Sequence, residues 1–381
     1  MKAKNVAKMP VKRFTMGAMR LFTYGITSFS HWVTTPFAPS DGDRVNAKSM
    51  LDCEPTAESL AHLERLFPHL PRPFHLSAAT QQRKPVEGAV KHLCIKRPAG
   101  KAFCRIGSGV YAASPELCFV QLATQLSFHE LIRAGNALCG SFYLSPAKDG
   151  RLEKRKPLTT RRRIEAFVRA NPGLTGAKKA RRAVPWIADG AASPPEAFLA
   201  MVLGLPFRHG GFQVAGFKVN QRIKPTRKAR AIAGRETLVP DLLLEKARLA
   251  IEYDSTAEHA AALQLTRDAQ KRLALEADRY KVITVTTKQL ASRAEMERIA
   301  RQIYRYTGQR FRPQSQSFEG QQALLFRMGW SLDGYWKASA EKVDRNGVAA
   351  HMNSFGAFAA GIDLSEPHRV ECSYDSWGSA W

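Results

Sequence analysis

The stretch that decides the fold runs from Val239 to Leu290 and reads VPDLLLEKARLAIEYDSTAEHAAALQLTRDAQKRLALEADRYKVITVTTKQL. Two runs rich in Leu, Ile, Val and Tyr, 237–244 and 248–253, flank the polar turn 245–247. Such runs on either side of a short polar turn are typical of a β-hairpin. The sequence therefore predicts two antiparallel strands here, the second of them well buried.

Periodicity predicts the elements around this hairpin. Helical spacing over 263–279 predicts a helix whose apolar stripe is Leu265, Ala269, Leu273 and Ala277, with Asp268, Lys271 and Arg272 to its side. Residues 281–287 predict a buried strand and 288–304 a closing helix. Upstream, Ser193-Pro194-Pro195-Glu196 is a helix-start signal for 194–203, and 216–223 predicts a first strand. The expected order is helix, three strands, helix and strand.

Three acidic residues converge at the end of the predicted hairpin. Asp241 lies on its first strand, and alternation places Glu252 and Asp254 on one face of the second. Residues that face each other in an antiparallel pair are about 5 Å apart, so we expect Asp241 to approach Glu252. Carboxylates that close require a cation or protons between them, and hard oxygen ligands suit Mg²⁺ or Mn²⁺.

The segment 193–304 resembles the restriction-endonuclease-like PD-(D/E)XK superfamily, specifically its compact branch related to very-short-patch-repair endonucleases. The residues that carry the resemblance are Pro240-Asp241, Ile251-Glu252-Tyr253-Asp254, His259, and Arg267-Asp268 through Arg272. The resemblance implies an α+β fold, with acidic residues that hold Mg²⁺ at a splayed strand end. Two positions depart from the family pattern: Asp254 stands where lysine is usual, and Ser255 stands where glycine normally follows.

The resemblance also implies roles. Asp241 and Glu252 are the expected metal ligands, and Glu196 is expected to bind a second ion or position water, as the family's first-helix glutamate does. His259 is a candidate general acid or base because its ordinary pKa is near neutrality. Lys271 or Arg272 on the next helix is expected to supply the missing cation, and Arg272 to contact the scissile phosphate.

Each of these residues also has a purely structural interpretation. Asp241 and Glu252 would then cap the hairpin or pair with Arg248 and Arg272, and Asp254 would form a turn after the strand. His259 would be a surface residue at a helix start. Glu196 would only interact with a helix dipole, and Asp268 and Arg272, four residues apart, would form a solvated ion pair.

The charge of the chain points to a polyanionic partner. Lys and Arg number 58 against 33 Asp and Glu, a net charge of +25, which favours salt-dependent binding to DNA. Two basic runs, 151–182 and 218–235, flank the predicted nuclease core. The residues expected to contact DNA are Arg161, Arg162, Arg163, Lys178, Lys179, Arg181, Arg182, Arg222, Lys224, Arg227 and Lys228. The alternative is a surface whose charge serves solubility.

Composition sets the broader limits. No apolar run reaches the roughly 18 residues that a transmembrane helix needs, and no clear cleavage site follows the basic N-terminus, so a cytoplasmic protein without a membrane partner is expected. The six cysteines show no C-x-x-C and no zinc spacing, and we interpret them as reduced thiols.

The chain divides into five predicted parts. These are a poorly ordered N-terminus (1–56), a mixed α/β region (57–146), a basic helical connector (147–190), the nuclease-like domain (191–308) and a flexible tail (309–381). Within 57–146, helices are predicted at 60–66 and 117–134. The motifs Ser114-Pro115-Glu116-Leu117-Cys118 and Leu138-Cys139-Gly140 make this region similar to the one that precedes nuclease-like domains in proteins related to AbiEi-type abortive-infection regulators.

Two functional hypotheses follow from the sequence. The first is an Mg²⁺-dependent DNA endonuclease in phage defence or DNA repair, and the second is a catalytically silent DNA-binding regulator or antitoxin-like protein on the same fold. An RNA-binding accessory protein would need aromatic stacking residues among the basic runs, where only Phe167 and Trp186 are present. The sequence leaves the target site and the oligomeric state open.

Overall fold

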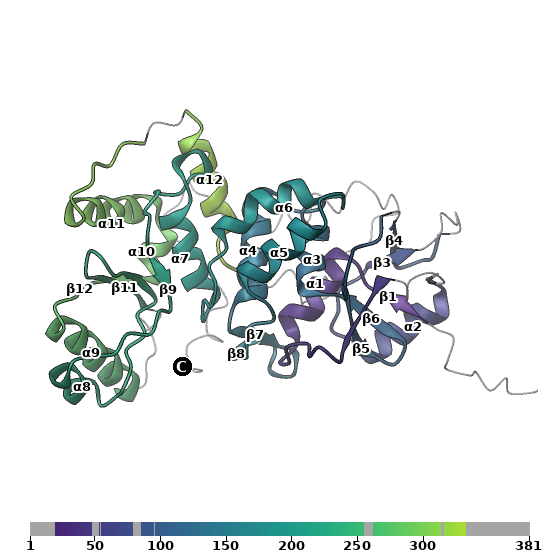
Figure 1. The fold of residues 1–381 in the computed structure, drawn as a ribbon, viewed down its shortest axis with the longest axis horizontal. Coiled ribbons are helices and arrows are strands. Elements are labelled where there is room, and N and C mark those ends of the chain that lie inside the picture. The colour runs from purple at the N-terminus through teal and green to yellow at the C-terminus, as the bar shows by residue number, and fades with distance from the viewer. Residues whose placement is uncertain are drawn as a thin grey trace, which may run out of the picture.

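A computed structural model describes residues 20–47, 53, 55–78, 85–94, 96–254, 262–313 and 316–332. It is a mixed α and β protein, elongated in projection, with one body formed by the N-terminal half and a second layered unit formed by the C-terminal half (Figure 1). One large hydrophobic core runs through both, from Phe22 to Leu332. The two halves are therefore packed together rather than joined by a linker.

The N-terminal body surrounds a four-stranded sheet of order β1-β6-β5-β2 and two smaller sheets, β3-β4 and β7-β8. Its strands are β1 (Leu21–Phe22), β2 (Arg44–Val45), β3 (Phe74–Ala78), β4 (Ala89–Leu93), β5 (Phe103–Gly107), β6 (Val110–Ala113), β7 (Phe142–Ser145) and β8 (Arg151–Lys154). Its helices are α1 (Gly25–Thr34), α2 (Ala57–Leu66), α3 (Pro115–Leu122), α4 (Phe128–Cys139), α5 (Arg161–Ala170) and α6 (Ala177–Ala183), with short 3₁₀ turns η2 (Pro146–Lys148) and η3 (Val184–Trp186).

The C-terminal unit is built on a second four-stranded sheet, of order β12-β11-β10-β9. β9 and β11 both pair antiparallel with β10, and β12 is parallel to β11. The elements follow as α7 (Pro194–Gly204), η4 (Phe207–His209), β9 (Lys218–Val219), α8 (Arg227–Ala233), β10 (Leu242–Leu244), β11 (Leu249–Asp254), α9 (Ala262–Ala277), β12 (Lys281–Thr286), α10 (Thr287–Ala291), α11 (Arg293–Tyr306) and α12 (Phe318–Met328).

Side-chain alternation along the strands makes this unit three layers thick. Ile251 and Val285 pack into the large core with α7, α10 and α11, whereas Ala250 and Val282 pack with α8 and α9 in a separate small cluster. Figure 1 shows α8 and α9 on one side of the sheet and α7, α10 and α11 on the other. The second strand of the hairpin, the strand at 281–287 and the helices at 194–203 and 263–279 are confirmed within one or two residues, whereas the first hairpin strand, predicted at 237–244, covers only Leu242–Leu244.

The apolar stripe predicted on α9 is wrong. Leu273 is 55% exposed and Ala269 is also exposed, whereas Ala274 and Leu275 are fully buried against Ala229 and Ala233 of α8. The side chain of Leu265 lies outside the described residues. The stripe is rotated because the small side chains of α8 cover this face, and the rotation brings Lys271, one turn before Leu275, toward the sheet.

Two helices predicted as continuous are divided in two. The expected helix 117–134 is α3 followed by α4, and the expected helix 288–304 is α10 followed by α11. Ser127 caps α4 in a capping box with Glu130, and Ser292 accepts a hydrogen bond from the amide of Glu295 at the start of α11. These serines end the preceding helices because their side chains satisfy the next helix's N–H groups. The predicted strand at 216–223 is reduced to β9.

Three predicted linkers or tails contain folded segments in the residues that the structure describes. In α1, all but one of ten residues are buried, and Trp32 Nε1 donates a hydrogen bond to the Ala113 carbonyl at 2.7 Å. The basic helices α5 and α6 pack on α3 and α4 as part of the N-terminal body. α12 packs on α7, where Phe326 meets Phe198 edge to face. The apolar side chains of these segments find their partners far away in the sequence, so local composition did not reveal them.

Candidate active site

Asp241 lies in the bend that leads into β10, beside the C-terminal end of the neighbouring strand β11. The register pairs Leu242 with Ile251, and its continuation places Asp241 opposite Glu252. The amide N–H of Tyr253 donates a hydrogen bond of 2.7 Å to Asp241 Oδ2. The backbone of the neighbouring strand thus fixes the direction of the Asp241 carboxylate.

The alternation of β11 decides which helix reaches Glu252. Ala250 faces α9 and Ile251 faces α7, so Glu252 also lies on the α9 side and Tyr253 on the α7 side. The Tyr253 hydroxyl shares a hydrogen bond of 3.0 Å with Thr287 Oγ1 at the start of α10. Glu252 therefore faces α9, the helix that carries Lys271.

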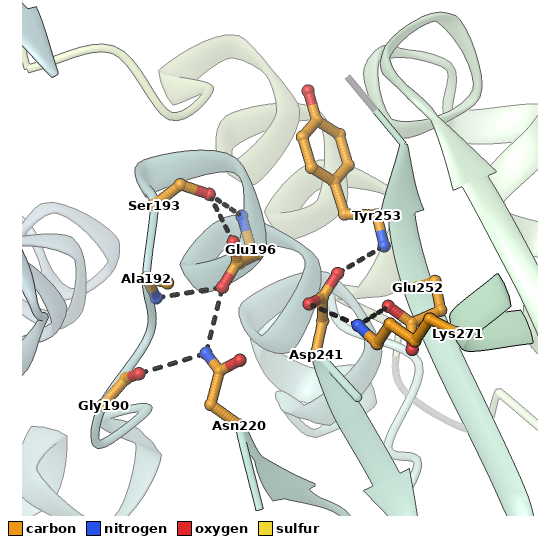
Figure 2. Close-up of polar contacts among 9 residues, drawn as sticks. All are labelled: Gly190, Ala192, Ser193, Glu196, Asn220, Asp241, Glu252, Tyr253 and Lys271. Atoms are coloured by element: carbon orange, nitrogen blue, oxygen red, sulfur yellow. Dashed lines mark hydrogen bonds and ion pairs between the residues drawn. The ribbon is translucent and has the colours of Figure 1, made fainter. Parts of the chain in front are cut away.

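Lys271 of α9 joins the two carboxylates. Its Nζ lies 2.5 Å from Glu252 Oε2 and 3.9 Å from Asp241 Oδ1. Figure 2 shows the three side chains converging from β11, the start of β10 and α9. Their side chains are only 16%, 15% and 24% exposed, respectively, for Glu252, Asp241 and Lys271. The expectation that Asp241 and Glu252 share one side of the sheet is confirmed.

The pKa values of the two acids reflect this crowding. Burial, together with the charges of Glu196 and Glu252, raises the pKa of Asp241 well above its ordinary value, and Lys271 offsets this only in part. Burial likewise raises the pKa of Glu252, against the opposing effect of Lys271. Burial disfavours the charged form of Lys271, but Glu252 and Asp241 outweigh it and raise the pKa of the ammonium. The site holds more negative charge than its lysine neutralises.

One carboxylate oxygen of this group stands out. Glu252 Oε1 is buried, and within the part of the chain that the structure describes it has no hydrogen-bond partner. Leaving a buried charged oxygen unpaired costs on the order of 1–3 kcal/mol or more, so such atoms are rare in folded proteins. A carboxylate oxygen of this kind is the type of atom that a cation binds.

Glu196 is fully engaged by its own chain. Its Oε1 accepts a hydrogen bond from Ser193 Oγ at 3.0 Å, and its Oε2 accepts from the Ala192 amide at 2.9 Å and from Asn220 Nδ2 at 3.0 Å. Asn220 in turn donates its backbone N–H to the Asp241 carbonyl at 2.9 Å. Glu196 thus lies near the acids, through Asn220, as a positioning residue, and its structural role as a helix-start residue is also realised (Figure 2).

No role was predicted for Asn220. Its backbone has a φ of 47°, in the left-handed region that asparagine tolerates better than most residues. An asparagine directly after the short β9 was the available signal. Its conformation lets one amide group tie the Glu196 turn to Gly190, whose carbonyl accepts a hydrogen bond from Nδ2 at 3.1 Å.

Of the other predicted site residues, Arg272 lies apart from the group of Asp241, Glu252 and Lys271. Arg272 points away on α9, 60% exposed, and pairs with Glu276 at 3.1 Å, so the expected pair with Asp268 is replaced by this one. Asp254 ends β11 opposite Thr286 and is partly buried. His259 lies outside the described residues. Of the two lysine substitutes considered, the structure brings in Lys271.

The residues predicted to bind DNA fall in two separate regions, the helices α5 and α6 and the segment that includes the start of α8. Arg161, Arg162 and Arg163 begin α5, and Arg163 already pairs with the buried Glu116 at 3.4 Å. On α6, Lys178, Arg181 and Arg182 are exposed, whereas Lys179 donates a hydrogen bond to the Leu126 carbonyl. Arg222 and Lys224 lie exposed in the loop before α8, and Arg227 and Lys228 form its exposed first turn. The C-terminal set is part of the layer that carries Lys271.

Metal-binding geometry is incomplete in the described residues. Within the described ranges, no group of three or more His, Cys, Asp or Glu side chains is arranged to hold a metal ion. The physical reason is local: Lys271 lies at the carboxylate pair, and both oxygens of Glu196 accept hydrogen bonds from the chain. Asp241 and Glu252 are the two acids left to face a cation.

Comparison with known proteins adds no relative. No protein-family model matches the chain, and neither a characterised protein nor a solved structure is significantly similar to it. Over the described part of the chain, no helix has both the length and the apolar character needed to cross a bilayer. Any function must therefore be argued from the site itself.

Proposed function

We propose that this protein is a divalent-metal-dependent nuclease that hydrolyses phosphodiester bonds in DNA, with Asp241, Glu252 and Lys271 as its catalytic residues. The observation that carries the proposal is the unpaired buried oxygen Glu252 Oε1 beside Asp241, with one lysine ammonium between the carboxylates. Two acids and a lysine at the open end of a hairpin are the residue types that metal-dependent phosphodiester hydrolysis uses.

The arrangement of elements supports the same proposal. The order α7, β9, β10, β11, α9, β12 is the one implied by the restriction-endonuclease-like resemblance, with α8 added between β9 and β10. The lysine that the family carries two residues after its glutamate is replaced by Asp254, and Lys271 of α9 lies 2.5 Å from Glu252 instead. The proposal therefore assigns the family's missing lysine to a neighbouring helix.

Two carboxylate oxygens of the site are of the type that a magnesium ion binds. Glu252 Oε1 and Asp241 Oδ1 would hold it, since both are hard oxygen ligands of neighbouring strands. A bound Mg²⁺ supplies Lewis acidity, which lowers the pKa of a coordinated water and offsets charge on the phosphate in the transition state. The Tyr253 amide holds Asp241 in place through Oδ2 and leaves Oδ1 facing Lys271.

Lys271 acts as a cation in this proposal and not as a base. Glu252 and Asp241 raise the pKa of its ammonium, so it stays protonated at neutral pH. A protonated ammonium donates hydrogen bonds to the phosphate oxygens, where negative charge grows during the attack of water. Burial beside the strands limits its motion, and this keeps the donor aimed at the cleavage position.

A nicking assay on supercoiled plasmid tests the proposal. Wild-type protein is compared with Glu252→Gln in Mg²⁺, Mn²⁺ and EDTA, and we expect cleavage only with metal and a loss of roughly a thousandfold in the variant. Glu245→Gln is the matched control, because Glu245 lies in the same hairpin but is 59% exposed and pairs only with the surface residue Lys218. Equal nicking by wild type and Glu252→Gln would assign the activity to a contaminant and end the proposal.

The second candidate is a DNA-binding regulator that keeps the fold without turnover. One observation favours it: the ion pair between Lys271 and Glu252 already occupies one side of the carboxylate pair. If that ion pair were permanent, metals would neither stabilise the protein nor support cleavage. Metal-dependent nicking separates the two candidates, because only the nuclease binds a metal ion at Glu252 and hydrolyses DNA.

A further inference from the structure

A cavity opens next to the candidate active site, between α9 and the loop that follows α8. It encloses about 160 Å³ and is lined by Ala233, Arg235, Thr237, Leu238 and Val239 on one side and by Arg267, Asp268 and Lys271 of α9 on the other. Lys271 is shared: its ammonium contacts Glu252, and its side chain forms part of the cavity wall. The cavity therefore adjoins the carboxylate pair directly.

The charge of the lining is suited to an anion. Among the described lining residues, Arg235 and Arg267 contribute two positive charges against the acid Asp268, and the ammonium of Lys271, which is paired with Glu252, forms the wall toward the candidate active site. Arg267 and Lys271 lie one turn apart on the same face of α9, about 6 Å along the helix axis. Arg272, the next residue, lies on another face of α9 and pairs with Glu276. The position of each basic residue on the helix therefore decides which of them lines the cavity.

The size of the cavity selects among anions. Its volume of about 160 Å³ is room for a phosphate group with part of its hydration. Arginine presents a planar fork of N–H donors that matches phosphate oxygens, and the Thr237 hydroxyl adds another donor. A phosphate here would lie one helical turn of α9 away from the ammonium at the cleavage position.

We propose that the cavity between Arg235 and Arg267 is a second phosphate subsite, which binds the nucleic-acid phosphate adjacent to the one cleaved. The proposal rests on the nuclease function proposed above and extends it to the part of the substrate that flanks the cleaved bond. Holding two neighbouring phosphates fixes the strand along α9 and so orients the cleaved bond against Asp241 and Glu252. The bound group is either an internal phosphodiester or a terminal phosphate monoester.

Binding without metal tests the subsite independently of cleavage. Affinity for a fluorescent DNA duplex is measured in EDTA at several salt concentrations for wild type, Arg267→Gln, Arg267→Lys and Arg235→Gln, with Arg272→Gln as the matched control on the same helix. We expect Arg267→Gln and Arg235→Gln each to weaken binding about three- to tenfold and to flatten the slope of log affinity against log salt by about 0.9. Arg267→Lys should retain the slope, and Arg272→Gln should match wild type.

The two sources of phosphate are separated by comparing 5′-phosphorylated with 5′-hydroxyl duplexes. A preference for the phosphorylated end that Arg267→Gln abolishes identifies a terminal monoester, and equal weakening on both duplexes identifies an internal phosphate. Slopes for Arg267→Gln and Arg235→Gln equal to that of Arg272→Gln would overturn the subsite while leaving the nuclease proposal standing. Conversely, a changed slope in a protein that never nicks DNA would retain the phosphate subsite and reject the nuclease. Should Arg267→Gln fail to fold, Arg235→Gln on the other wall carries the same test.

Discussion

Two buried glutamates, one in each half of the molecule, have opposite environments. Glu116 of α3 is 4% exposed and accepts two hydrogen bonds from Arg44, at 3.0 and 3.3 Å, and one from Thr159 at 2.7 Å. The side chain of Glu252 of β11 is 16% exposed, yet its buried Oε1 has no hydrogen-bond partner among the described residues. Burial opposes ionisation of both, but the pKa of Glu116 is lowered by Arg44 and Thr159, whereas that of Glu252 is raised.

The difference separates a structural carboxylate from a functional candidate. At Glu116 the charge is neutralised and every oxygen is used, so the group holds α3 against the strand β2 and the start of α5. At Glu252 the same residue type is left partly unsatisfied beside another acid, an arrangement that costs stability and that folded proteins retain mainly at functional sites. Burial and charge alone would not have told the two apart, and hydrogen-bond satisfaction does.

The largest expected effect comes from removing the basic partner of each glutamate. Lys271→Met should lower metal-dependent nicking by roughly a thousandfold, about 4 kcal/mol of transition-state stabilisation, since no other described cation lies between the two acids. Arg44→Met should leave the activity per folded molecule unchanged. Arg272→Met controls for loss of a charge on α9. Full activity in Lys271→Met would reduce the lysine to a structural ion-pair partner.

A Glu→Gln substitution at both sites should give opposite stability effects. Glu116→Gln places an amide against the buried Arg44 and should lower the free energy of unfolding by about 3 kcal/mol, because an uncompensated charge remains buried. Glu252→Gln should change it by less than about 1 kcal/mol, since the variant loses an ion pair but also relieves repulsion with Asp241. Urea unfolding in EDTA measures both. A larger loss at Glu252 than at Glu116 would contradict the distinction drawn here.

A smaller effect is expected from Asp241→Asn, whose melting temperature should differ from that of wild type in a way that depends on pH. The folded-state pKa of Asp241 is raised, so its contribution to stability is full below the unfolded value near 3.9 and is lost as pH rises through the folded pKa. The variant does not titrate there. We therefore expect equal melting temperatures of variant and wild type in acid, and a growing advantage for the variant toward neutral pH in EDTA. Added Mg²⁺ should shrink that advantage, because it stabilises only wild type. A difference in melting temperature that is independent of pH would show that the folded state does not raise the pKa of Asp241.

Local signals explain which parts of the fold could be predicted. The hairpin of β10 and β11, the Pro-Pro start of α7 and the strand β12 each follow from a few neighbouring residues. The pairing of Asp241 with Glu252 followed from the short turn, because hairpin register depends on turn length. What the sequence could not fix was the rotation of α9, since α8 covers its Ala274 and Leu275 face and is itself placed by tertiary packing.

The errors in the N-terminal half have a related cause. The apolar side chains of α1 contact residues far along the chain, and the buried guanidinium of Arg155 donates hydrogen bonds to the carbonyls of Trp32 and Thr35. Arg155 belongs to the basic run 151–182, but the fold uses its guanidinium to satisfy carbonyls at the end of α1. The capping serines Ser127 and Ser292 were visible in the sequence, and their pairing with Glu130 and Glu295 was the signal that the two long helices are interrupted.

The smallest expected effect returns to Glu116 and the arginines beside it. Arg162 and Arg163 are exposed neighbours at the start of α5. They differ in that Arg163 Nε lies 3.4 Å from Glu116 Oε1. If α5 follows a DNA backbone, Arg162→Gln should flatten the slope of log affinity against log salt by about 0.9, because one phosphate contact is lost. Arg163→Gln should flatten it less, since Glu116 already offsets its charge. Binding titrations at several salt concentrations measure both slopes, with melting temperatures as the control for folding. Equal slopes in Arg162→Gln and wild type would remove α5 from the DNA path and direct the search to Arg222, Lys224 and the first turn of α8, on the same side of the sheet as Lys271.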